Sequence, residues 1–291
     1  MPGLVGLVIV LGSGRVFRAG IASEWAPTVG LCAGAGGGFV LVLGKWPTFP
    51  PIQSSEWIVY LTALALGGGV VESARLIPDG VRWASRTLVC ALVVGVVSRR
   101  LFVNAGIDPA TIKILWAMAP GVVVIAIASW RAQERLAREG TGALPALVLL
   151  IALAGLAVVL TLVGSLKLGQ FAGSVASAMG GVLAGWWIGR RVKPGPGPIA
   201  AGWVLLLAIL LTGYAYVQGL SPILAGLVLV CPPAAWIGQV VRHRRTGMAL
   251  AVVCSLLPIV AAVLIAWERS HDLDADDPYA GVQRIADDTR A

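Results

Sequence analysis

Charged residues are spaced along this chain so that they separate long apolar runs. Between Pro194 and Val241 there is no Asp, Glu, Lys or Arg, and between Thr141 and Gly189 the only one is Lys167. One crossing of a bilayer needs about 20 apolar residues, so each of these intervals is long enough for two crossings. The pattern predicts a polytopic membrane protein built from apolar helices.

Ten apolar runs can be separated by the charged, proline and glycine residues that flank them. The predicted spans are 1–14, 25–45, 56–77, 83–99, 113–130, 143–166, 170–189, 199–217, 220–241 and 248–267. The first run is the weakest, because only the stretch from Met1 to Leu11 precedes Gly12-Ser13-Gly14. The expected fold class is therefore an all-α, polytopic integral membrane helical bundle of nine or ten transmembrane helices. Residues 1–269 are expected to form this single domain.

Basic residues cluster on alternate loops between the predicted spans. Because cytoplasmic loops carry an excess of Lys and Arg, the richer side is predicted to be cytoplasmic. The chain is then expected in a bacterial-type plasma membrane with its C-terminus outside. The richer side holds Arg15/Arg18, Arg75/Arg82/Arg86, Arg131/Arg135/Arg138, Arg190/Arg191/Lys193 and Arg242/Arg244/Arg245, and the other side holds Lys45, Arg99/Arg100/Lys113 and Lys167.

Tryptophan placement supports the predicted boundaries. The chain has 11 tryptophans, and each lies at or within about two turns of a span end, where the indole N–H stays hydrated while the ring contacts lipid. Trp187-Ile188-Gly189 is also repeated as Trp236-Ile237-Gly238, each copy at the end of a predicted helical hairpin. This repeat fits either a duplicated hairpin or a chance match between apolar sequences.

The composition of the chain agrees with a membrane protein and argues against a nucleic-acid-binding protein. The 291 residues are 58% hydrophobic and 12% charged, whereas about a quarter of residues are charged in soluble domains. The net charge is +8, but residues 1–269 carry 20 basic and 8 acidic side chains, and residues 270–291 carry two arginines and six aspartates. The basic excess therefore belongs to loops of a protein whose partner is the lipid bilayer, and nucleic acid is not expected as a partner. Residues 270–291 are expected to form a flexible, acidic extracytoplasmic tail.

Two triple-glycine runs form the candidate substrate path. Gly36, Gly37 and Gly38 lie in one predicted span, and Gly67, Gly68 and Gly69 lie in the next. At ~1.5 Å per residue, the runs lie ~12 and ~16 Å below their shared external loop. The favoured interpretation is close helix packing through small residues. The alternative is that both helices break there and free backbone groups for a substrate site at mid-depth.

Glu72 is the best candidate for an ionisable group on the same path. It follows the second glycine run, and Arg75 lies three residues later on the same helical face. The favoured interpretation is an ion pair near the cytoplasmic end, with Arg82 and Arg86 nearby. The alternative is a carboxylate that couples transport to an ion or proton.

The sequence contains no familiar catalytic or metal-binding pattern. It lacks G-x-S-x-G, H-E-x-x-H and G-x-x-x-x-G-K-[ST], and its four cysteines lie in apolar segments without metal-ligand spacing. No catalytic residue, metal or cofactor is therefore predicted. The expected function is a transporter or permease-like protein for a small solute or lipid. The alternatives are a non-catalytic membrane subunit or scaffold with membrane-protein partners or a second copy, and a membrane-embedded transferase that uses Glu72 and Asp79.

Overall fold

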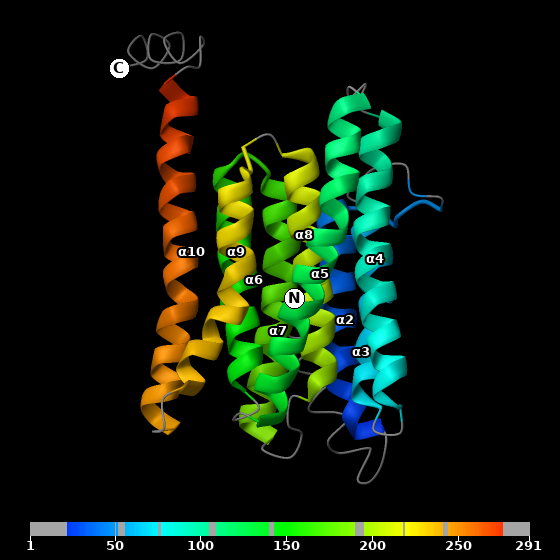
Figure 1. Cartoon of the computed structure of the whole chain (residues 1–291), viewed down its shortest axis with the longest axis vertical. Helices are drawn as coiled ribbons and strands as arrows, with labels where there is room; N and C mark the ends of the chain where they lie inside the picture. Colours follow the sequence, from blue (N-terminus) through cyan, green and yellow to red (C-terminus); the bar gives the residue numbers. More distant parts are fainter. Residues whose placement is uncertain are drawn as a thin grey trace.

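The fold is helical throughout the part of the chain that the structure describes. In this computed structural model the described residues are 22–49, 51, 56–74, 77–104, 109–139, 143–189, 195–217, 219–240 and 244–275, and these ranges contain no β-strand. They form α2 (Ala22–Leu43), α3 (Glu56–Ser73), α4 (Asp79–Asn104), α5 (Pro109–Glu139), α6 (Leu144–Leu162), α7 (Leu166–Gly189), α8 (Pro196–Tyr216), α9 (Pro222–Ala234), the 3-10 helix η1 (Ala235–Val240) and α10 (Arg244–Ala275). Figure 1 shows these helices running side by side along the long axis of the molecule.

Each predicted segment from 25–45 onward corresponds to one α-helix, with one interruption. In the segment 220–241, α9 ends at Ala234 and η1 continues the chain. This break follows Pro232-Pro233, because proline has no backbone N–H and disrupts the preceding helical turn. The predicted segment 1–14 and residues 276–291 of the acidic tail lie outside the described residues, whereas α10 itself continues to Ala275.

Six helices of the described part are long and apolar enough to cross a membrane. α3 and α5 fall outside this set, α3 carries Glu56 and Glu72 close to its two ends, and the apolar stretch Pro222–Ile237 is shorter. Length and hydropathy therefore support six of the nine or ten predicted spans. The six are Trp25–Leu43, Asp79–Val97, Leu144–Leu162, Leu166–Ile188, Pro196–Tyr216 and Thr246–Ser270.

α8 is the central helix of the bundle. Among the candidate spans it is the most buried, at 78%, whereas the span in α10 is only 22% buried. α8 packs most extensively on α3, and its buried Trp203 donates the indole N–H to the carbonyl oxygen of Ala126 on α5 at 3.2 Å. α10 stands at the edge of the bundle and packs on α6, α9 and η1 (Figure 1).

The two Trp-Ile-Gly sequences do not occupy equivalent structures. Trp187-Ile188-Gly189 ends α7, whereas Trp236-Ile237-Gly238 lies in η1. α7 packs mainly on α6, but α9 packs mainly on α10 rather than on α8. The packing of the first hairpin is therefore not repeated in the second.

α2 and α3 run through their glycine triplets without a break. A β-carbon added at Gly69 would lie 2.8 Å from the carbonyl oxygen of Gly197 and 3.2 Å from the side chain of Ala201, both on α8. Gly37 and Gly67 face outward, and a β-carbon added at either position would have no neighbouring atom within 4 Å. One face of α3 therefore uses glycine for close packing on α8, and the broken-helix interpretation does not describe these helices.

We expect Gly69→Ala to destabilise the bundle, because its β-carbon requires α3 and α8 to separate. Overpacking of this kind costs about 1–3 kcal/mol. Gly67→Ala, in the same run, is the matched control and should be neutral or slightly stabilising because alanine is the better helix former. Thermal unfolding of both variants in one detergent measures the difference. Equal Tm values for the two variants would contradict the packing role.

Candidate functional site

A buried ion triad, formed by Glu72, Arg86 and Glu134, joins α3, α4 and α5. Arg86 Nε donates to Glu72 Oε1 at 2.6 Å and Arg86 Nη2 donates to Glu72 Oε2 at 2.9 Å. The same Nη2 lies 2.5 Å from Glu134 Oε2. The three side chains are 1%, 4% and 11% exposed for Glu72, Arg86 and Glu134. One guanidinium group is thus shared by carboxylates from two other helices.

Helix geometry brings these three residues to one level. Glu72 is close to the end of α3, which finishes at Ser73. Arg86 lies two turns inside α4, about 10 Å along the axis from Asp79 at ~1.5 Å per residue. α4 packs on both α3 and α5, so its arginine faces acids on either side. The planar guanidinium fork suits this bridging position because it offers donors in fixed directions.

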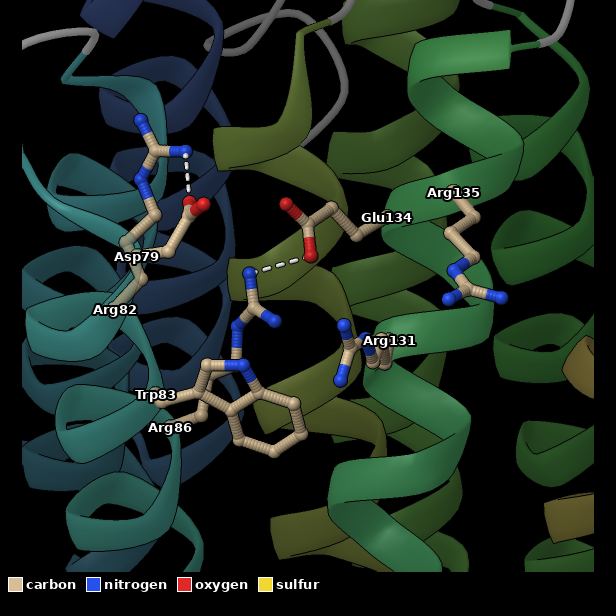
Figure 2. A pocket seen from close by; sticks show the side chains of 7 residues that line it. All are labelled: Asp79, Arg82, Trp83, Arg86, Arg131, Glu134 and Arg135. Carbon is tan, nitrogen blue, oxygen red and sulfur yellow. Dashed lines mark hydrogen bonds and ion pairs between the residues drawn. The ribbon is translucent and has the colours of Figure 1, made fainter.

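A pocket of about 290 Å³ lies beside the ion triad, between α4 and α5. Figure 2 shows its lining side chains, with Arg86 and Glu134 in the middle and Arg135 on the α5 side. Four arginines and two carboxylates line the pocket, so positive charge is in excess. The lining residues are Asp79, Arg82, Trp83, Arg86, Arg131, Glu134 and Arg135, which we call the arginine pocket.

Two tryptophans position arginines around the arginine pocket. The Arg131 guanidinium lies 4.6 Å from the ring centroid of Trp83, and the Arg86 guanidinium lies 5.7 Å from it. Arg135 lies 5.9 Å from the ring centroid of Trp236 in η1. Cation–π contacts of this length are favourable and hold a guanidinium without neutralising its charge. Arg131 and Arg135 therefore keep a positive charge for another partner.

Arg82 forms part of the α4 wall and holds an unused donor. Its Nη2 donates to the carbonyl oxygen of Ala74 at 2.9 Å, and its Nη1 lies 3.5 Å from Asp79 Oδ1. Arg82 is only 8% exposed, and its buried Nε has no hydrogen-bond partner among the described residues. A buried donor without a partner costs about 1–3 kcal/mol. The arginine pocket thus contains a buried N–H that an added acceptor would satisfy.

Gln133 ties the α5 side of the pocket to the break in α9. Its Nε2 donates to the carbonyl oxygen of Pro232 at 2.6 Å, close to the point where α9 passes into η1. Its Oε1 is buried without a hydrogen-bond partner within the described ranges. This contact and the contact of Arg135 with Trp236 fix α5 against the interrupted helix.

The structure brings some of the sequence-predicted site residues together and leaves others apart. Glu72 does form an ion pair, but its partner is Arg86, while Arg75 lies outside the described residues. Asp79 lines the arginine pocket, whereas the six glycines of the candidate path do not line it. Glu134 was missed. The sequence offers one signal for Glu134, an acid among the arginines at the end of an apolar run, but this signal does not name its partner on α4.

The chemistry of the pocket suits an anion rather than a metal ion. Within the described residues no group of three or more His, Cys, Asp or Glu side chains could hold a metal. The cysteines of the described part, Cys32, Cys90, Cys231 and Cys254, are free thiols. The donors that line the arginine pocket are guanidinium groups, which bind oxyanions through charge-assisted hydrogen bonds.

We expect Arg86→Met to destabilise the protein by about 3–5 kcal/mol, because it leaves two buried carboxylates without their cation. The double variant Glu72→Gln/Arg86→Met should recover part of this loss, since one of the two carboxylates is removed as well. Lys167→Ala, which removes an exposed charge on α7, is the control for charge loss alone. Unfolding in detergent, compared as a double-mutant cycle, measures the coupling. If the Arg86→Met variant is as stable as the wild type, the ion triad does not hold the helices together.

The chain matches no protein-family model, no curated protein and no solved structure. Its function is therefore inferred from its own residues and their geometry.

Proposed function

We propose that this chain is a multi-pass integral membrane protein that acts as a transporter or permease-like protein for a small solute or lipid. The observation that carries this proposal is the arginine pocket, which is built on a buried ion triad at one end of an apolar helical bundle. Ionisable groups held between apolar helices are costly, and in membrane proteins they commonly mark substrate or ion paths. The apolar helices around the triad supply a membrane-compatible scaffold.

Exposed apolar side chains support the membrane location. Large apolar surfaces of this kind are rare on soluble monomers and are compatible with contact to lipid. We therefore propose that α3, α5 and α9 together with η1 cross the bilayer beside the six candidate spans, and that segment 1–14 adds a further span. On α10 the exposed apolar residues are Met248, Val253, Leu256, Leu257, Val260, Leu264 and Trp267.

The proposed orientation follows from the basic clusters. Arg82, Arg131 and Arg135 all lie at the end of the bundle that holds the arginine pocket, and an excess of basic residues marks the cytoplasmic side. α10 ends at the opposite end of the bundle (Figure 1). We therefore place the pocket at the cytoplasmic face, residues 1–269 in one membrane domain, and the acidic tail 270–291 outside a bacterial-type plasma membrane.

α10 favours a second candidate function, a non-catalytic subunit or scaffold. This helix is the least buried of the candidate spans and offers a broad apolar face to another membrane protein or to a second copy.

The third candidate, a membrane-embedded transferase, is favoured by Asp79, whose side chain is 86% exposed at the edge of the pocket. The transporter remains the first proposal because it uses the pocket and the buried charges together.

The orientation predicts opposite labelling of two engineered cysteines. In a chain whose native cysteines are replaced, Lys167→Cys should react with a membrane-impermeant maleimide in intact cells. Asp79→Cys should react only after the cells are permeabilised, because it lies at the other end of the bundle. Both native side chains are exposed, so neither substitution disturbs packing. Labelling of Asp79→Cys from outside intact cells would overturn the proposed orientation.

Transport is tested by uptake into vesicles that contain the purified protein. The panel should hold small phosphate esters, carboxylates, neutral solutes and fluorescent phospholipids. We expect at least one compound to enter, and Arg131→Ala to lower its flux about tenfold because a charge-assisted contact is lost. Lys167→Ala should match the wild type. If no compound moves while the protein remains folded, the transporter is wrong and the subunit becomes the first candidate.

A further inference from the structure

We propose that the arginine pocket binds a phosphate-bearing anion, either as the headgroup of a lipid or as a small soluble phosphate ester. The inference names the substrate class of the proposed transporter and rests on that proposal for its place at the cytoplasmic face of the membrane. The binding site itself is defined by contacts that do not depend on transport. Its essential residues are Arg82, Arg131 and Arg135.

The arginine pocket carries more positive than negative charge. The four arginines of the pocket face only Asp79 and Glu134 within its lining, and Glu72 lies behind Arg86. The charge of Arg86 is compensated by its two carboxylate partners, Glu72 and Glu134. Of the other three arginines, Arg82 lies 3.5 Å from Asp79, a long distance for an ion pair. Four guanidinium groups against the carboxylates of Asp79, Glu134 and Glu72 leave a surplus of one positive charge, which a singly charged anion neutralises.

Arg82 keeps an unused donor in the wall of the pocket. Its Nε is buried without a hydrogen-bond partner in the described part of the chain, although the residue lines the pocket and is only 8% exposed. An oxyanion in the pocket would accept from this N–H, whereas a neutral or cationic ligand would leave the donor unsatisfied.

The placement of the arginines on two helices fits a phosphate group better than a carboxylate. A carboxylate has two oxygens and is fully used by one guanidinium fork, whereas a phosphate group presents three or four oxygens in different directions. The three arginines come from two helices, Arg82 from α4 and Arg131 and Arg135 from α5, so their guanidinium groups lie on different sides of the pocket (Figure 2). Arginine pairs with phosphate in this bidentate manner. The pocket of about 290 Å³ holds a headgroup-sized ligand.

The surface around the pocket is compatible with either source of the phosphate group, a lipid headgroup or a soluble phosphate ester. α4 exposes Val81, Leu88 and Leu92, and α5 exposes Val124 and Ile125. These apolar side chains give acyl chains a surface on the same two helices that form the pocket. Trp83 is half-buried in the pocket wall and is suited to the boundary between headgroup and hydrocarbon. A soluble phosphate ester would use the same arginines from the aqueous side.

The test is equilibrium binding to the full-length protein in a neutral detergent. The probes are inorganic phosphate, glycerol 3-phosphate, phosphatidic acid and phosphatidylglycerol, with acetate, oleate and diacylglycerol as the probes that lack phosphate. We expect at least one phosphate probe to bind, and we expect its affinity to fall as the salt concentration is raised. Binding of the soluble probes identifies a phosphate ester, and binding of the lipids alone identifies a headgroup. Equal binding of acetate or oleate would overturn the assignment to phosphate.

Variants separate this site from general attraction to a basic protein. Arg131→Ala and Arg135→Ala should each raise the apparent Kd about tenfold, because each removes a charge-assisted contact. Arg82→Lys keeps the charge but loses Nε, and it should weaken binding to a similar extent. Arg269→Ala removes an exposed arginine of α10 and is the matched control, with an unchanged Kd. If all three pocket variants fold normally and bind with wild-type affinity, the proposal is overturned.

Failure of this inference is distinguishable from failure of the proposed function. Phosphate binding that depends on the arginines, without flux of any compound, overturns transport and leaves the site intact. Flux of a neutral solute that is unaffected by Arg131→Ala and Arg135→Ala, together with no binding of any phosphate probe, overturns the phosphate site and leaves transport intact.

Discussion

The ion triad is the interaction on which the rest of this structure depends. Arg86 joins Glu72 and Glu134, so three helices must meet at one level before any of the charges is compensated. Removing such charges from water costs several kcal/mol per ion, and the cost is offset only when geometry and hydrogen bonds are complete. The triad therefore contributes specificity, because an arrangement of α3, α4 and α5 that separates the partners leaves buried charge uncompensated. The arginine pocket exists because this arrangement places α4 and α5 side by side at their charged ends.

Close packing provides the complementary constraint on α3. Between apolar helices in lipid, hydrophobic burial gives little preference for one neighbour over another, so small residues and polar contacts select the partner. Gly69 allows α8 to approach, and Ser73 donates to the carbonyl oxygen of Gly69 within the same turn region. Thr28 on α2 completes the contact through its hydroxyl, which lies 3.5 Å from that of Ser73. One end of α3 is thus fixed by glycine and hydroxyl contacts on one side and by Glu72 on the other.

Sequence reasoning located the helices well because their signal is local. An uncharged run bounded by arginines predicts an apolar helix whichever neighbours it later meets, and the segments from 25–45 onward each contain one. The partners of charged residues are not local. Spacing along one helix suggested Arg75 for Glu72, whereas the observed partner, Arg86, lies on the next helix. Glu134 was missed for the same reason, since its role depends on α4. Of the nine or ten predicted crossings, length and hydropathy support six among the described residues.

Charge within the site gives its arginines different roles. The ion triad has two carboxylates and one guanidinium, so it is itself negative and repels an approaching anion. Arg82, Arg131 and Arg135 must first offset that negative charge before they can attract a ligand. Their positions suit this role, because Arg131 and Arg135 are held over tryptophan rings rather than carboxylates, and Arg82 keeps a buried N–H without a partner among the described residues. In the proposed phosphate site, Arg86 therefore stabilises the fold, while the neighbouring arginines provide the contacts to the anion. The carboxylates that hold the helices together also lower the positive charge of the pocket, so they weaken its attraction for an anion.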